Sequence, residues 1–79
     1  MRSEDIKRLL EAILPCDYIE VKGEDGAHFE ALIVSANFEN KPLIQQHKIV
    51  YAALGEHMKA NIHAFSMRTL TPAQWQQDK

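Results

Sequence analysis

The side chains best suited to bind a metal in this 79-residue chain are four histidines and one cysteine: His28, His47, His57, His63 and Cys16. Imidazole and thiolate groups are common protein ligands for transition metals. Their spacing fits none of the usual zinc patterns, and no serine–histidine–aspartate set or carboxylate pair can be assigned by motif. We therefore expect a protein that is not an enzyme and does not hold zinc by itself.

Length and composition limit the chain to one small domain, residues 1–79, with 46% hydrophobic residues. The net charge of −2 and the pI of about 6.0 argue against general attraction to nucleic acid, although a local basic face is still possible. A single cysteine excludes an internal disulfide and suits a reducing compartment. The charged start is unlike a signal peptide, and no apolar run is long enough to span a membrane. A cytoplasmic location is expected.

Two amphipathic segments predict helices. The first covers residues 3–14, with Ser3 as its N-cap and Pro15 ending it. The second runs from Leu43 to about Lys59, and Gly55 interrupts it, where we expect another backbone to pack closely. Its apolar stripe is formed by Leu43, Val50, Leu54 and Met58, widened by Ile44 and Tyr51.

Three segments predict strands: residues 17–22, 28–35 and 62–70. The turn at residues 23–26 joins the first two into a hairpin. Thr71, Pro72 and Gln74 form a capping-box pattern that starts a short C-terminal helix anchored by Trp75. The order α-β-β-α-β-α predicts an α/β (α+β) domain in which helices cover one face of a three-stranded mixed sheet. A crossover through the central helix would pair the third strand parallel to a hairpin strand.

Four stretches of the sequence, in this order and spacing, resemble the BolA family, most of all its short-loop, IbaG-like bacterial subgroup and short eukaryotic relatives. They are Phe29-Glu-Ala-Leu-Ile-Val-Ser-Ala-Asn-Phe38, Lys41-Pro-Leu-Ile-Gln-Gln-His-Lys-Ile-Val-Tyr51, Ile62-His-Ala-Phe65 and Thr69-Leu-Thr-Pro-Ala-Gln-Trp75. The resemblance implies a KH-like fold and a cytosolic partnership with monothiol glutaredoxins. In such complexes a [2Fe–2S] cluster is bridged between the two proteins, for cluster trafficking or for iron and redox sensing. We expect no cluster in the isolated chain, which would be a monomer or a weak homodimer.

The resemblance also implies a ligand set. A glutaredoxin cysteine and a glutathione thiol hold one side of the cluster, and the family's ligand histidine matches His63. The second ligand of the family comes from the loop between the first two strands, as histidine or cysteine. That loop is short here, and its one candidate is His28. Cys16 is kept as a third candidate because thiolate is the usual ligand in iron–sulfur sites.

An alternative function is DNA binding by a transcriptional regulator of a stress response, as some BolA-like proteins are described. The candidate residues are Lys41, His47 and Lys48, presented by the central helix. The more ordinary role for His47 is at the edge of the core. The Gly-x-x-Gly at residues 23–26 is not a KH phosphate loop, because it lies in a hairpin and carries two carboxylates.

Overall fold

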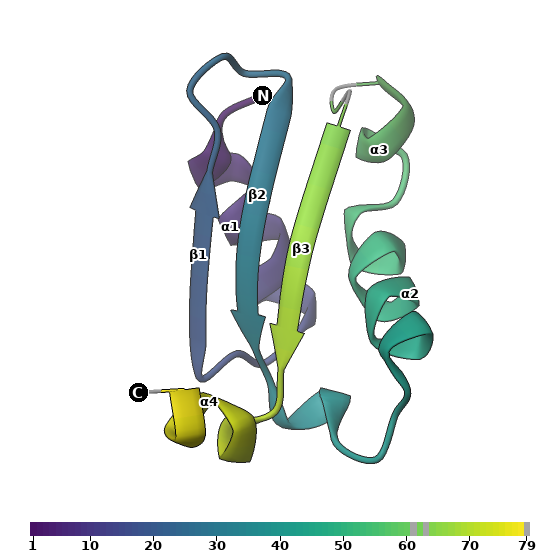
Figure 1. Cartoon of the computed structure of the whole chain (residues 1–79). Coiled ribbons are helices and arrows are strands. Elements are labelled where there is room, and N and C mark those ends of the chain that lie inside the picture. Colours follow the sequence, from purple (N-terminus) through teal and green to yellow (C-terminus); the bar gives the residue numbers. More distant parts are fainter. Residues whose placement is uncertain (61, 63, 79) are drawn as a thin grey trace.

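The computed structural model describes residues 1–60, 62 and 64–78 (Figure 1). The elements, in chain order, are α1 (Ser3–Ile13), β1 (Tyr18–Lys22), β2 (His28–Val34), the 3₁₀ helix η1 (Ala36–Phe38), α2 (Leu43–Leu54), α3 (His57–Ala60), β3 (Ala64–Leu70) and α4 (Pro72–Asp78). The expected order is confirmed, but the central helix is divided in two. Within these residues no helix is long and apolar enough to cross a membrane.

The three strands form one mixed sheet in the order β1-β2-β3. β1 pairs antiparallel with β2 across the hairpin, and β3 pairs parallel with β2 after the helical crossover. The register places Lys22 opposite Glu30 at one end of the hairpin and Tyr18 opposite Val34 at the other. The end with the hairpin turn is also where β3 begins, while α4 lies at the opposite end (Figure 1).

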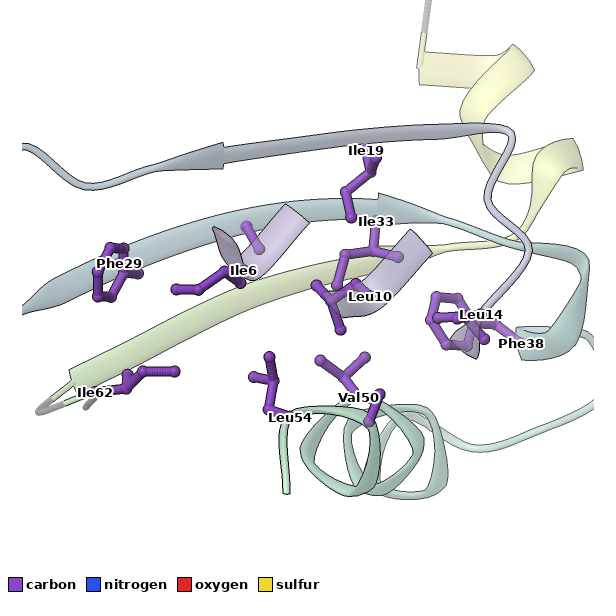
Figure 2. Close-up of a cluster of buried hydrophobic side chains, with 12 residues drawn as sticks. Ile6, Leu10, Leu14, Ile19, Phe29, Ile33, Phe38, Val50, Leu54 and Ile62 are labelled. Carbon is purple, nitrogen blue, oxygen red and sulfur yellow. The ribbon is translucent and has the colours of Figure 1, made fainter. Parts of the chain in front are cut away.

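The core fills the space between the sheet and helices α1 and α2. Figure 2 shows Val50 and Leu54 of α2 pointing toward Ile6 and Leu10 of α1. In the central strand, alternate side chains starting at Phe29 face this core, because strand periodicity sends every second residue to the same side. The predicted three-stranded mixed sheet is confirmed, with α1 and α2 covering the face that forms the core.

Two helix boundaries differ from the prediction. Gly55 ends α2 instead of lying inside a longer helix: its φ of +56° is a left-handed conformation that glycine adopts without steric cost. A Cβ there would meet its nearest atom only at 3.9 Å, so close backbone packing is not the reason for this glycine. At α1 the N-cap is Arg2, whose N–H donates to Asp5 Oδ2 at 2.9 Å, and Ser3 is the first helical residue.

The buried face of α2 is also rotated from the predicted stripe. Val50 and Leu54 are buried as expected, but Leu43, Ile44 and Tyr51 are exposed. The buried face includes Gln46 instead. The apolar pattern did not reveal this, because a glutamine is buried only where a tertiary partner satisfies its amide.

Gln46 is satisfied by a polar network that ties the start of α2 to β3. Its Nε2 donates to the carbonyl oxygens of Lys41 (2.9 Å) and Phe38 (3.3 Å). Its Oε1 accepts from the hydroxyl of Thr69 at 2.6 Å. This network holds the loop between η1 and α2 against the third strand.

The C-terminal helix begins with the predicted capping box. Gln74 N–H donates to Thr71 Oγ1 at 3.2 Å, and Thr71 N–H donates to Gln74 Oε1 at 2.9 Å. Trp75 then stacks on Tyr18 of β1, with ring centroids 4.8 Å apart. Tyr18 neighbours the buried Ile19, so it lies on the sheet face away from α1.

Candidate functional site

His28 is the first residue of the central strand, at the sheet end that carries the hairpin turn. Its parallel-strand partner is Ala64, the first residue of β3, and Ala64 N–H donates to Ala27 O at 3.2 Å. His63, the principal candidate from the sequence, lies outside the described residues. In the chain it is bonded directly to Ala64. The strand pairing therefore joins His28 to the residue that follows His63.

Asp25 is a site residue that the sequence analysis counted only as part of the turn. Its Oδ1 accepts from the backbone N–H groups of Ala27 and His28, both at 2.9 Å. Its Oδ2 lies 2.7 Å from Nδ1 of His28. These hydrogen bonds lower the pKa of Asp25 well below its usual range. The backbone N–H of His28 has the largest effect, followed by that of Ala27 and by the His28 ring. Asp25 is therefore an ionised carboxylate, and the Asp-x-x-His spacing was its sequence signal.

This pair lines an open groove with a volume of about 680 Å³. The groove is formed by residues 22–25, 28–30 and 64–66. Both side chains are accessible, since 65% of His28 and 56% of Asp25 is exposed. A large partner can therefore reach the imidazole.

The described part of the chain does not form a complete metal site. Over residues 1–60, 62 and 64–78, no three His, Cys, Asp or Glu side chains are grouped to hold an ion. His28 and Asp25 fit a ligand and the carboxylate that orients it, an arrangement common at metal centres. Any further ligands would come from other groups, in this chain or in a partner.

Cys16 lies at the other end of the sheet from His28. It precedes β1, beyond the Tyr18–Val34 pair, whereas His28 stands six residues before Val34 in β2. At about 3.3 Å per residue this separation is about 20 Å, too far for one [2Fe–2S] cluster. Its Sγ–H donates to Leu14 O at 3.2 Å, and burial, with Glu11 and Asp17, raises the pKa of the thiol. Cys16 is a protonated, half-buried thiol outside the His28 site.

The residues of the DNA-binding alternative do not form a continuous basic face. Lys41 is exposed, and its Nζ donates to Asn37 O at 2.7 Å. Lys48 is exposed, while His47 is half-buried. The exposed surface of the same helix includes the apolar side chains of Leu43 and Ile44, 59% and 65% accessible. Its chemistry is mixed, with no concentration of positive charge.

Comparisons with known proteins agree on one family. A family model described as BolA-like protein matches residues 16–74. The human protein BolA-like protein 2 is 37% identical over 83 aligned residues, covering 100% of this chain and 95% of that protein. Acid stress protein IbaG of Escherichia coli K12 is 32% identical over 80 residues, covering 100% and 94%.

A solved structure extends this agreement to the fold. The crystal structure of a bol-like protein from Babesia bovis superimposes with a TM-score of 0.88 at 33% identity, covering 99% of this chain and 93% of that one. The family is thus supported by the sequence similarity, by the αββαβα order and by the parallel β2–β3 pair. This chain belongs to the BolA family.

Proposed function

We propose that this protein joins a monothiol glutaredoxin and glutathione to coordinate a bridging [2Fe–2S] cluster, for cluster trafficking or for iron and redox sensing. His63 and His28 are the ligands from this chain, and the partner and glutathione supply the thiolates. The observation that carries the proposal is the imidazole of His28, held by Asp25 at an accessible groove where β3 begins one residue after His63. Membership of the BolA family supports the class of partner.

The chemistry of His28 suits this role. Neutral imidazole binds iron through one nitrogen, and a hydrogen bond to a carboxylate at the other nitrogen makes it a better ligand. Because Nδ1 of His28 faces Asp25, the nitrogen available to iron is Nε2. β2 also gives the ligand a rigid base, since its first residue is paired with β3.

Histidine ligation would give the cluster two properties. Ligands must be deprotonated to bind, and imidazole takes up a proton near neutral pH, so the cluster should become labile in acid. Histidine in place of cysteine also raises the reduction potential of a [2Fe–2S] centre. Both properties suit transfer or sensing better than storage.

The test is assembly of the complex from purified chain, monothiol glutaredoxin, glutathione, iron and sulfide. Visible absorbance and circular dichroism report the cluster. We expect His63→Ala and His28→Ala each to alter the spectrum and shorten cluster lifetime. Cys16→Ala is the matched control, because it removes a potential ligand at the other end of the sheet. Wild-type spectra and lifetime in His63→Ala would refute the ligand assignment.

Binding measurements with the same purified components distinguish the proposed function from two others. An adaptor that binds no cluster would bind glutaredoxin equally well with and without iron, sulfide and glutathione. A DNA-binding regulator would bind duplex DNA with steep salt dependence, and Lys48→Glu would weaken that binding without changing the cluster. The mixed surface around Lys48 does not favour this alternative. Absence of duplex binding at low salt would eliminate it.

A further inference from the structure

The carboxylate of Asp25 is oriented by backbone hydrogen bonds that do not involve the His28 ring. Oδ1 accepts two backbone N–H groups, from Ala27 and from His28 itself, so the side chain folds back over its own turn. This leaves Oδ2 directed at Nδ1 of His28, 2.7 Å away. The two residues are three apart, and Gly26 between them takes a φ of +74°. The turn therefore sets the direction of the carboxylate independently of any ligand.

An ionised carboxylate only accepts hydrogen bonds, so the ring nitrogen facing it must carry the proton. In the neutral imidazole this assigns the proton to Nδ1 and the lone pair to Nε2. The other tautomer would set the Nδ1 lone pair against a negatively charged oxygen. The local geometry thus selects one tautomer of His28.

We propose that Asp25 is a positioning residue that holds His28 as the Nδ1–H tautomer and so reserves Nε2 for binding iron. The part that concerns iron rests on the function proposed above. The part that concerns the tautomer does not, because it follows from contacts within this chain. The two parts can therefore be tested separately.

The decisive variant is Asp25→Asn. The side-chain oxygen of asparagine can still accept from the backbone N–H groups of Ala27 and His28, so the turn is retained. Its NH₂ group then replaces Oδ2 as a donor facing Nδ1, which favours the tautomer protonated at Nε2. Glu24→Gln is the matched control: it removes one negative charge from the same turn and leaves the carboxylate of Asp25 in place.

The first measurement uses the protein alone. Two-bond ¹H–¹⁵N correlation spectra of the ring nitrogens, recorded at alkaline pH where imidazole is neutral, report the tautomer. We expect Nδ1–H for His28 in wild type and in Glu24→Gln, and a shift toward Nε2–H in Asp25→Asn. His47 serves as an internal reference whose spectrum stays the same. An Nε2–H tautomer in wild type, or an unchanged tautomer in Asp25→Asn, overturns the proposal.

The second measurement uses the complex with glutaredoxin, glutathione and cluster. Loss of a carboxylate that orients a ligand typically weakens metal binding by about 10- to 100-fold. We expect Asp25→Asn to shorten cluster lifetime in that range, with Asp17→Asn, the same change at the opposite end of the sheet, as control. A tautomer shift with unchanged cluster lifetime overturns the role of Asp25. Failure of wild type to assemble any cluster refutes the proposed function instead, while the spectra of the free protein still decide the tautomer.

Discussion

Gly23 is the position where one added methyl group should most directly disturb the candidate site. It follows β1 and lies against the buried ring of Phe29, which is 2% exposed. A Cβ on Gly23 would contact the Cδ1 atom of this ring, with Cε1 at 2.7 Å and the carbonyl oxygen of His28 at 2.9 Å. Protein atoms do not pack this closely, so Gly23→Ala must displace the ring or the start of β2.

Overpacking of this kind typically lowers the free energy of unfolding by about 1–3 kcal/mol. A chain of 79 residues has a total stability of about 4–12 kcal/mol, so the change is easily measured. Phe29 directly follows His28, so the displacement also moves the candidate ligand. We therefore expect a shorter cluster lifetime in Gly23→Ala under conditions where the variant is still fully folded.

Urea denaturation of a double-mutant cycle tests this explanation. If the clash with Phe29 causes the loss, Gly23→Ala should cost less in a Phe29→Leu background, with a coupling of about 0.5–3 kcal/mol. Gly26→Ala is the control. Its Cβ would meet its nearest atom, Met1 O, at 3.7 Å, so its cost comes from the backbone φ of +74° and not from crowding. That cost, about 1–2 kcal/mol, should be the same in both backgrounds.

An equal cost for Gly23→Ala in both backgrounds would show that the ring of Phe29 is not the obstacle. A loss below about 0.5 kcal/mol, within the range of ordinary surface substitutions, would show that the turn relaxes freely. Either result would refute the steric link between Gly23 and the candidate site.

Three further perturbations test other parts of the structure. Thr69→Val removes the hydroxyl that donates to Gln46 Oε1 and leaves a buried amide oxygen unpaired. We expect the free energy of unfolding, measured by urea denaturation, to fall by about 1–3 kcal/mol. A change below about 0.5 kcal/mol would contradict the network. The raised pKa of Cys16 means that its contribution to stability is present below the ordinary thiol pKa of about 8.5 and is lost as the pH rises through the folded value. Cys16→Ser should therefore flatten the fall in stability above the ordinary thiol pKa of about 8.5, and an unchanged slope would refute this. If His28 and His63 bind the cluster, its visible absorbance should decay faster at about pH 6 than at about pH 8, whereas a lifetime independent of pH would argue against histidine ligands.

The sequence alone was enough to predict most of the elements and the family. Alternating strands, the crossover helix and the capping box at Thr71 and Gln74 are local patterns, and local hydrogen bonds and periodicity determine them. The resemblance to the BolA family is confirmed by the family match and by the fold. The assignment of His63 as a ligand stays a prediction.

Sequence patterns failed where a residue's role depends on a distant partner. Gln46 is polar, yet it is buried because Thr69, 23 residues away, satisfies its amide. Leu43 and Ile44 are apolar, yet they are exposed because α2 packs through a different face. Such roles are set by packing, which periodicity within one helix cannot show.

For the candidate site, too, some features could be predicted from the sequence and others required the tertiary structure. The sequence and the family resemblance by themselves determined which candidate ligands were available: His63 and His28, with Cys16 as a third candidate. Only the tertiary structure decided that His28 is paired with Ala64, that Asp25 holds its ring, and that Cys16 lies about 20 Å away at the other end of the sheet. The physical reason is strand register. Residue spacing along the chain says what a segment can form, but hydrogen bonding between strands fixes which side chains meet.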